Sequence, residues 1–317
     1  MPGKALIFGV SGQDGAYLAR HLLDKGYEVH GTSRDADLAD FSNLQTLGIR
    51  EQVRVHSAMP TDFRSVVQVV TSAEPTEIYN LAGQSSVSLS FDLPAATLES
   101  IAMGTLNILE AIRMLDSKTR FYNACSSECF GNTEDGPASE ATPFRPRSPY
   151  AVAKAASYWV VTNYREAYGL FACSGILFNH ESPLRQARFV TRKIVDTAKR
   201  IAGGSNEKLK LGRLDVQRDW GWAPEYVEAM SKMLTLDKPD DFVIATGQSH
   251  SLEEFVDETF KALGLVRSRH VETDPVLQRP IDLSVSRGDP SKARQLLGWQ
   301  AQSKMPDVIR KMIAGQA

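Results

Sequence analysis

The sequence predicts an α/β protein in which helices cover both faces of a parallel sheet and a smaller mixed α/β lobe follows. Apolar runs of strand length alternate with longer helical stretches from Lys4 to about Leu177, and this alternation stops after Leu177. Strands that alternate with helices form parallel sheets with both faces covered. With 317 residues, of which 42% are hydrophobic, the chain is long enough for one large domain or two unequal lobes.

The first half contains six segments with the length and apolar character of strands. Helical stretches lie between them, for example at 16–25 and 105–116. The predicted strands are 4–9, 27–31, 53–57, 77–82, 120–126 and 173–178.

The second half has fewer regular signals and no clean linker. A short strand is predicted at 242–247, and 271–290 is irregular. Helices are predicted near 191–201, 251–264, 289–299 and 305–315.

The bulk composition argues against several classes of function. The formal net charge is -2, and the chain has neither a long basic tract nor an apolar run of about 18 residues, so we expect no nucleic-acid partner and no membrane span. The start of the chain does not resemble a signal peptide, and Cys125, Cys129 and Cys173 suit a reducing compartment, so we expect a cytoplasmic protein. Neither the cysteines nor the six histidines have metal-ligand spacing, so no metal site is predicted.

A glycine-rich turn follows the first predicted strand and precedes a helix. Gly9, Gly12 and Gly15 are three residues apart, with Gln13 and Asp14 between the last two. Glycines permit a tight turn and close approach of the backbone to a pyrophosphate, and the helix start supplies free amides. The turn predicts a Rossmann-type, doubly wound sheet that binds a dinucleotide.

This turn also suggests the division of the chain. Residues 1–177 are predicted to form the dinucleotide-binding domain and 178–317 the substrate lobe, with the chain crossing back around 215–250. The predicted boundary is soft.

The end of the second predicted strand bears on the choice of cofactor. An acidic residue there binds a ribose diol, whereas hydroxyl groups and arginine accept a 2′-phosphate. Ser33 and Arg34 are placed for a phosphate, and Asp35 follows them. We therefore favour NADP over NAD, and a solvated loop stays an alternative for Asp35 and Asp37.

Four residues near the middle of the chain form a candidate catalytic group. Tyr150 precedes Lys154 by four residues in a predicted helix, so both lie on one helix face. Tyrosine titrates near ~10, and a nearby cation is needed to make it a base near neutral pH. Ser126 and Glu128 end a predicted strand, at the sheet edge where such folds bind ligands.

Motifs along nearly the whole chain, from Lys4 to about Trp299, resemble those of GDP-mannose 4,6-dehydratases in the extended short-chain dehydrogenase/reductase superfamily. The glycine turn and the Tyr150/Lys154 pair mark only the superfamily. The motifs that carry the resemblance are GVSGQDGAYLA, YNLAGQSSVSLSF, SSECFG, SPYAVAK, GILFNHESP, FVTRKI, QRDWG and DFVIATGQSHS.

The resemblance implies a role for each member of the catalytic group. Tyr150 takes the proton of the sugar's 4-hydroxyl while hydride leaves C4, and Lys154 lowers the pKa of Tyr150 and holds the cofactor ribose. Glu128 removes the C5 proton, water leaves from C6, and hydride returns to C6. Ser126 stands where the family usually has threonine and keeps the hydroxyl that binds the 4-oxygen.

The resemblance also implies the binding residues. His180 and Glu181 are expected to order their loop, and a structural salt bridge stays an alternative for each binding arginine. Cofactor contacts are implied at Gly9, Gly12, Gln13, Asp14, Gly15, Ser33, Arg34, Leu81, Ala82, Tyr150, Lys154, Leu177, Asn179 and His180. Contacts to the GDP-sugar are implied at Ser85, Ser126, Asn179, Val190, Lys193, Leu211, Gly212, Arg218, Arg279 and Asp282.

The chain departs from the family pattern at several positions. The arm after the second strand is short, and Asp35 replaces an expected arginine. We therefore expect a homodimer through helices around 105–115 and 150–164, or a tetramer formed as a dimer of dimers. Met59 replaces an aspartate that usually meets adenine, and Asp282 replaces a glutamate.

The favoured function is that of a GDP-mannose 4,6-dehydratase that yields GDP-4-keto-6-deoxymannose. The alternatives are a dehydratase, oxidase, reductase or epimerase that acts on another GDP-sugar, such as a GDP-heptose. A non-catalytic dinucleotide-binding regulator is disfavoured because the whole catalytic group is present.

Overall fold

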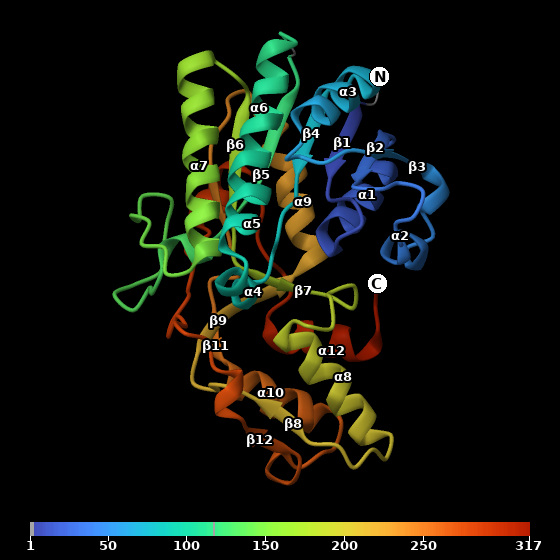
Figure 1. Cartoon of the computed structure of the whole chain (residues 1–317). Helices are drawn as coiled ribbons and strands as arrows, with labels where there is room; N and C mark the ends of the chain where they lie inside the picture. Colours follow the sequence, from blue (N-terminus) through green and yellow to red (C-terminus); the bar gives the residue numbers. More distant parts are fainter. Residues whose placement is uncertain (1–2, 117) are drawn as a thin grey trace.

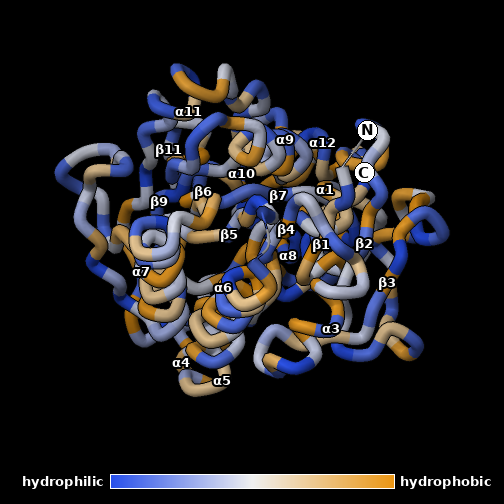
Figure 2. Tube along the Cα trace, turned by 90° about the horizontal axis from the view of Figure 1, so that it is seen from above, coloured by the Kyte–Doolittle hydropathy of each residue, from blue (hydrophilic) through white to orange (hydrophobic). Residues whose placement is uncertain are grey.

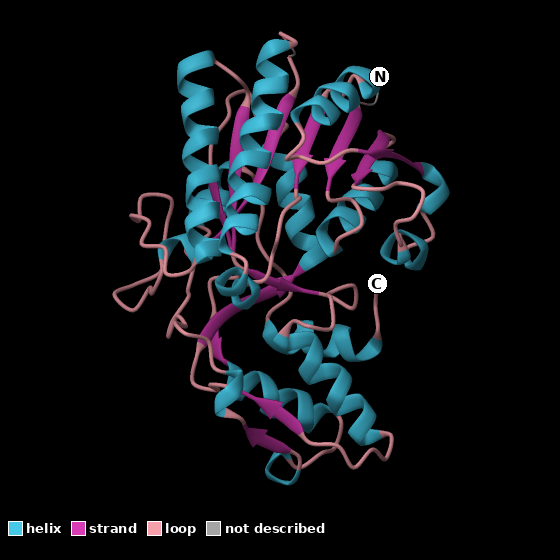
Figure 3. Ribbon diagram, in the orientation of Figure 1, coloured by secondary structure: helices cyan, strands magenta, loops and turns pink. Residues whose placement is uncertain are grey.

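The computed structural model describes residues 3–116 and 118–317, and its main feature is a seven-stranded sheet. The strands are β1 (Lys4–Phe8), β2 (Glu28–Ser33), β3 (Val53–Ser57), β4 (Glu77–Asn80), β5 (Arg120–Ser126), β6 (Ala172–Leu177) and β10 (Phe242–Ile244). They pair in parallel in the order β10-β6-β5-β4-β1-β2-β3 (Figures 1 and 3). The winding direction reverses between β1 and β4, which is where such sheets bind ligands.

Helices cover both faces of this sheet, which confirms the doubly wound α/β class. They are α1 (Gln13–Asp24), α3 (Phe63–Ala73), α6 (Gly104–Met114), α7 (Pro149–Tyr168) and α9 (Ala223–Met233). Figure 2 looks down on the sheet and shows α3, α6 and α7 on one side and α1 and α9 on the other. Leu18 of α1 and Met230 of α9 share one buried cluster, whereas Val66, Ile108 and Val161 pack in another.

The start of α7 sets the position of the predicted tyrosine and lysine. Ser148 precedes the helix, and its hydroxyl accepts a hydrogen bond from the amide of Ala151. Pro149 occupies the first helical position, where its missing amide hydrogen costs nothing. Tyr150 therefore lies in the first turn of α7, and Lys154 lies one turn later on the same side.

The second lobe consists of two small sheets and three main helices around a buried cluster. A three-stranded sheet has the order β11-β9-β7, and β8 pairs with β12. Ile194, Phe255 and Ile309 lie in the cluster between the helices. The elements are β7 (Asn179–Glu181), α8 (Val190–Ala202), β8 (Leu209–Leu211), β9 (Gln217–Trp222), β11 (Ser249–Ser251), α10 (Leu252–Ala262), β12 (Val271–Thr273) and α12 (Met305–Ala314).

The chain returns to the large sheet between these elements. After β9, helix α9 packs against α1, and β10 then pairs with β6. The division into residues 1–177 and 178–317 stays a prediction. The remaining helices, apart from short 3₁₀ segments, are α2 (Ser42–Thr46), α4 (Val87–Asp92), α5 (Pro94–Leu98), a π-helical segment (Glu99–Met103) and α11 (Ser291–Leu296).

The short strands of the second lobe and helix α9 are absent from the sequence-based expectations. Strand β9 shows why, because it buries the charged residues Arg218 and Asp219, which break any apolar alternation. Asp219 accepts hydrogen bonds from the amides of Thr246 and Gly247. None of the helices in the described part of the chain has the length and apolar character of a membrane span.

Candidate active site

A cavity of about 590 Å³ lies where the carboxyl ends of the central strands face the second lobe. Residues from both halves of the chain line it, so it brings the predicted catalytic and substrate residues together. The predicted residues in its lining are Asp14, Leu81, Ser85, Ser126, Glu128, Tyr150, Lys154, Leu177, Asn179, His180, Val190, Lys193, Leu211, Gly212, Arg218, Arg279 and Asp282. The predicted cofactor residues outside its lining are Gly9, Gly12, Gln13, Gly15, Ser33, Arg34 and Ala82.

The turn after β1 has the shape of a phosphate cradle. Gly9 is in the left-handed region at φ 89°, and its carbonyl oxygen accepts the amide of Gly12 at 3.1 Å. A Cβ atom on Gly15 would lie 2.2 Å from the Gly9 oxygen, so the helix can approach only without a side chain. A Cβ atom on Gly12 would meet only the Gly9 oxygen, at 3.4 Å, and would occupy space that a ligand can use. With α1 uncapped by a side chain, these residues fit a dinucleotide pyrophosphate.

Asp14 and His180 form an ion pair that joins this cradle to β7. The Nε2 atom of His180 lies 2.9 Å from Asp14 Oδ2, and its Nδ1 atom lies 2.7 Å from the carbonyl oxygen of Phe178. Both ring nitrogens face acceptors, an arrangement that favours the doubly protonated ring. Burial raises the pKa of Asp14, but the charge of His180, the hydrogen bonds from His180 and Gln13 and the charge of Arg185 together outweigh burial, and the pKa is about 2. Burial lowers the pKa of His180, and Asp14 reverses this so that the pKa is raised.

The loop after β2 leaves Asp35 engaged with its own backbone. The Asp35 carboxylate accepts hydrogen bonds from the amides of Asp37 and Leu38, both at 3.0 Å. Arg34 is exposed beside it, and Ser33 is half-buried at the end of the strand. The carboxylate therefore stabilises a local turn.

The four predicted catalytic residues all line the cavity. Ser126 ends β5, and its Oγ atom accepts the amide of Glu128 at 3.3 Å, which caps the 3₁₀ turn 127–130. The Nζ atom of Lys154 donates to the carbonyl oxygen of Ala124 at 2.6 Å and lies 5.9 Å from the centre of the Tyr150 ring.

Burial governs the titration of three of these residues. It raises the pKa of Glu128, against the opposing charges of Arg218 and Arg279. It also raises the pKa of Tyr150, with a hydrogen bond from Ser126 acting in the opposite direction. Burial lowers the pKa of Lys154. We expected Lys154 to lower the pKa of Tyr150. In the protein alone the pKa of Tyr150 is raised instead, because the desolvation of its phenolate form outweighs the other contributions.

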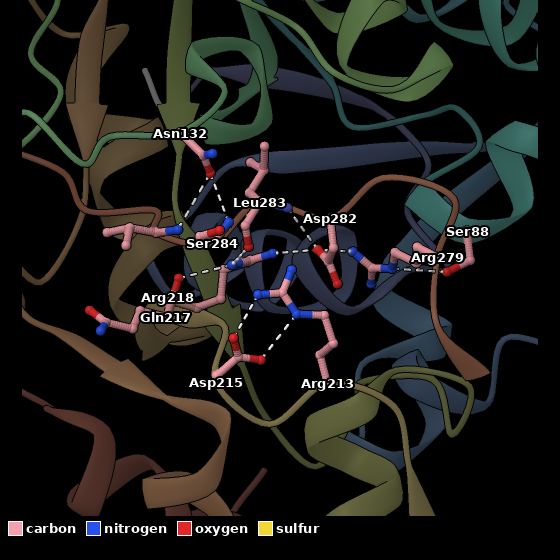
Figure 4. Close-up of polar contacts among 11 residues, drawn as sticks. Ser88, Asn132, Arg213, Asp215, Gln217, Arg218, Arg279, Asp282, Leu283 and Ser284 are labelled. Atoms are coloured by element: carbon pink, nitrogen blue, oxygen red, sulfur yellow. Dashed lines mark hydrogen bonds and ion pairs between the residues drawn. The ribbon is translucent and has the colours of Figure 1, made fainter. Parts of the chain in front are cut away.

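Arg218 and Arg279 are organised by one carboxylate (Figure 4). The Oδ1 atom of Asp282 accepts hydrogen bonds from Arg218 at 2.8 Å and from Arg279 at 3.3 Å. Arg279 also donates to the hydroxyl of Ser88 at 3.1 Å, which ties the second lobe to α4. Asp282 therefore forms an ion pair with each arginine. The two arginines thus make the salt bridges expected as the alternative, and they also line the cavity.

Residues of α8, β8 and the segment after β12 also line the cavity. Lys193 donates to the carbonyl oxygen of Lys210 at 2.6 Å. Gly212 lies against this segment, because a Cβ atom there would be 2.9 Å from the Leu277 oxygen. Val190 and Leu211 add apolar surface.

The cavity lining includes polar residues that sequence reasoning missed: Ser88, Arg185, Arg188 and Arg213. Arg185 stacks on Phe189 at 3.8 Å and lies 3.4 Å from the Glu181 carboxylate. The repeated arginines directly after the NHESP motif are the signal that could have identified Arg185 and Arg188.

Cys125 lies in β5 and Cys129 in the 3₁₀ turn 127–130, next to Ser126 and Glu128 in the chain. Both are free and buried, with their sulfur atoms 3.7 Å apart, and they pack among apolar side chains. Burial raises the pKa of the Cys129 thiol. Within 3–116 and 118–317, no group of histidine, cysteine and acidic residues has the arrangement of a metal site.

Comparison with known proteins identifies the family. The family model described as GDP-mannose 4,6 dehydratase matches residues 6–312. The chain belongs to the GDP-mannose 4,6-dehydratase family. GDP-mannose 4,6 dehydratase 2 of Arabidopsis thaliana is 47% identical over 98% of this chain and 85% of its own. GDP-mannose 4,6-dehydratase of Sinorhizobium fredii is 44% identical over 98% of this chain and 95% of its own. The family resemblance is thereby confirmed.

Solved structures similar to this member of the dehydratase family share its fold. UDP-glucose 4-epimerase of Thermus thermophilus, in complex with NAD, superimposes with a TM-score of 0.87 at 25% identity and covers 98% of both chains. dTDP-glucose 4,6-dehydratase of Bacillus anthracis, also with NAD, gives a TM-score of 0.85 at 17% identity, covering 99% of this chain and 96% of its own. RMD of Pseudomonas aeruginosa with NADPH gives a TM-score of 0.80 at 20% identity, covering 99% of this chain and 98% of its own.

Proposed function

We propose that this chain is a lyase that converts GDP-mannose to GDP-4-keto-6-deoxymannose. The observation that carries the proposal is that a half-buried glutamate, Glu128, lines the same cavity as Tyr150, Lys154 and the arginines of the second lobe. Membership of the GDP-mannose 4,6-dehydratase family supports the same substrate and reaction.

The reaction needs two proton acceptors and one hydride carrier. The nicotinamide cofactor, when bound in the cradle, supplies the hydride chemistry. Tyr150 accepts the proton of the 4-hydroxyl, and Ser126 binds the 4-oxygen. Glu128 then removes the C5 proton, which the C4 ketone makes acidic. The 6-hydroxyl leaves with one proton as water, C6 takes up the hydride that left C4, and C5 takes up the other proton. Both protons and the hydride are therefore accounted for, and no net reduction of cofactor results.

The environment of Glu128 suits a group that takes and returns a proton. Its raised pKa brings the carboxyl closer to neutral pH, where general bases work best. Arg218 and Arg279 limit that rise and keep the carboxylate form accessible. Simple oxidation, reduction or epimerisation at C4 needs no base at C5, so the presence of Glu128 in the cavity wall favours elimination over those alternatives.

The product identifies the reaction. Incubation with GDP-mannose and NADP should give a product lighter by one water in mass spectrometry, without accumulation of reduced cofactor. Recovery of unchanged GDP-mannose at high enzyme concentration would contradict the proposal. A parallel assay with a GDP-heptose tests the alternative substrate, which is correct if its kcat/KM is higher.

A Glu128→Gln variant separates the two chemical stages. Loss of a general base lowers rates by about 10²–10⁴-fold, so elimination should fall by this factor while hydride exchange at C4 continues. Glu140→Gln is the matched control, since Glu140 is also a partly buried glutamate with a raised pKa but lies outside the cavity lining. Elimination that persists in Glu128→Gln would show that another residue is the base.

We further propose NADP as the preferred cofactor. Arg34 is exposed and Ser33 half-buried at the strand end, where both suit a 2′-phosphate, and the Asp35 carboxylate is occupied by the amides of its own turn. Arg34→Ala should weaken NADP binding and leave NAD binding unchanged in fluorescence titrations. Equal affinity of the wild-type protein for the two cofactors would contradict this preference.

We also propose a cytoplasmic homodimer, or a dimer-of-dimers tetramer, that pairs through α6 and α7. Trp159 and Val152 on α7 are 60% and 44% exposed, and Met114 at the end of α6 is 61% exposed. Such apolar exposure is typical of a protein interface. Light scattering should give a dimer or tetramer that Trp159→Glu converts to a smaller species, and a monomeric wild-type protein would contradict the proposal.

A further inference from the structure

Residues 282–285, which we call the 282–285 strap, begin at the arginine cluster of the cavity (Figure 4). The carboxylate of Asp282 accepts hydrogen bonds from both Arg218 and Arg279. Arg218 also donates to the carbonyl oxygen of Leu283 at 2.8 Å. The first half of the strap is therefore fixed by two arginines that are expected to contact the GDP-sugar, and guanidinium groups suit the diphosphate part of such a ligand.

The second half of the strap is held by Asn132, a residue outside all of the sequence motifs. The Oδ1 atom of Asn132 accepts the amide of Ser284 at 2.7 Å and that of Val285 at 3.5 Å. The amide of Thr133 donates to the Val285 oxygen at 3.0 Å. Figure 4 shows Asn132 reaching the strap from the side opposite Arg213.

The chain between Glu128 and Asn132 is short and constrained. The amide of Gly131 donates to the carbonyl oxygen of Glu128 at 3.2 Å, and Gly131 has φ 72°. A Cβ atom on Gly131 would lie 2.5 Å from the Arg145 oxygen, and the amide of Arg145 donates to the Cys129 oxygen at 2.8 Å. A displacement of Asn132 is therefore passed on to Glu128 rather than absorbed between them.

We propose that Asn132 is a positioning residue that couples the 282–285 strap to the placement of Glu128. When an anionic ligand binds Arg218 and Arg279, the arginines fix the start of the strap. Asn132 then keeps residues 127–131, which include Glu128, in a fixed position relative to the strap. The inference rests on the proposed function, because it requires Glu128 to act on the sugar that the diphosphate anchors. Catalysis at the base is then linked to occupancy of the diphosphate site.

The kinetic test compares three variants. Asn132→Ala removes one acceptor, whose loss costs about threefold to tenfold in rate, so kcat and C5 proton exchange should fall by this factor. The KM for GDP-mannose and hydride exchange at C4 should stay within about twofold, since neither depends on Glu128. Asn132→Asp keeps an acceptor for both amides and should restore the rate.

Ser249→Ala is the matched control. It removes the bond from the Ser249 hydroxyl to the Ser286 oxygen at 2.9 Å, directly beyond the strap, without touching the Glu128 loop. Equal losses in Ser249→Ala and Asn132→Ala would overturn the inference, because a general loosening of the segment would then explain both. A change in KM alone for Asn132→Ala would overturn it as well.

Amide hydrogen exchange with GDP as the probe separates this inference from the proposed function. In the wild-type protein, GDP should slow exchange in both the strap and residues 127–131. In Asn132→Ala, protection should persist in the strap and be lost at 127–131. Equal protection of both segments in the variant overturns the coupling whatever the activity, whereas a wild-type protein that dehydrates no GDP-mannose contradicts only the proposed function.

Discussion

The phosphate cradle and the arginine cluster are built in different ways. The cradle is made of backbone within seven residues of chain, between Gly9 and Gly15, and depends on missing side chains. The arginine cluster is made of side chains that come from distant positions: Arg218 meets Asp282 across 64 residues, and Arg279 meets Ser88 across 191.

This difference determines how each part responds to change. A cradle made of backbone has no flexible group that can move aside. An added side chain there can therefore lower both the stability of the fold and the affinity for the ligand. Side chains in an ion-pair network can relax individually, but a charge left alone in a buried position is costly. The predictions below separate these two behaviours.

The largest effect is expected from Arg218→Leu. The side chains of Arg218 and Asp282 are only 8% and 17% exposed, so the variant leaves a nearly buried carboxylate with a weaker partner and removes one cation from the cavity. Truncating one member of a charge pair between protein and ligand costs about 2–5 kcal/mol, so loss of an Arg218 contact to GDP should weaken GDP binding about 30-fold or more in calorimetry.

Arg200→Leu is the control for this effect. Arg200 pairs with Glu207 in the same lobe, but their side chains are 56% and 34% exposed. Exposed pairs contribute about 0–1 kcal/mol, so GDP affinity should stay close to that of the wild-type protein. Similar losses in the two variants would mean that burial of the Arg218 pair has no special importance.

The next effect concerns the cradle and compares Gly15→Ala with Gly12→Ala. The new Cβ atom at Gly15 would lie 2.2 Å from the Gly9 oxygen and 2.7 Å from the Val10 Cα atom, and both are backbone. Overpacking of this kind costs about 1–3 kcal/mol, so thermal unfolding should shift downwards and NADP binding should weaken.

Gly12→Ala should behave differently because its Cβ atom meets only one atom, at 3.4 Å. The thermal midpoint should be preserved, while NADP binding weakens through contact with the pyrophosphate. If Gly12→Ala unfolds as early as Gly15→Ala, the cradle is a packing feature and its link to the cofactor is lost.

The parts of the site that could be predicted from sequence are the local ones. The glycine spacing is contained in one turn, and Ser126 and Glu128 follow from the rule that strand ends meet at one edge of the sheet. Tyr150 and Lys154 follow from the helical repeat. The family motifs then supplied the residues of the second lobe.

The parts that could not be predicted depend on distant contacts and on burial. Asn132 meets Ser284 across 152 residues, and no local pattern marks such a pair. The direction of the Tyr150 pKa shift depends on how deeply the ring is enclosed, which spacing does not reveal. Strand β9 was missed because its buried residues include charges whose partners lie elsewhere in the chain.

The smallest effect concerns the Asp14–His180 pair, which joins the cradle to the second lobe. The groups that face His180 are Asp14 from α1, Arg185 from the loop after β7, and the ring of Tyr226 from α9 at 4.6 Å. The raised pKa of His180 adds stability that is present below its unfolded value, about 6.5, and is lost as pH rises through the folded value. The pKa of Asp14, about 2, adds stability that is present above about 3.9 and is lost as pH falls towards 2.

The pair should therefore stabilise the fold most between about pH 4 and 6.5, and thermal unfolding across pH measures this window. His180→Gln should remove the loss of stability on the alkaline side. His21→Gln is the control with the opposite sign, because burial and Lys25 lower the pKa of His21. This variant should therefore become more stable than the wild-type protein as pH falls below about 6.5. If His180→Gln keeps the wild-type pH dependence, the ring is neutral in the folded protein. The cradle and the second lobe would then be joined at β7 by an uncharged hydrogen bond, so this junction would not depend on charge as the arginine cluster does.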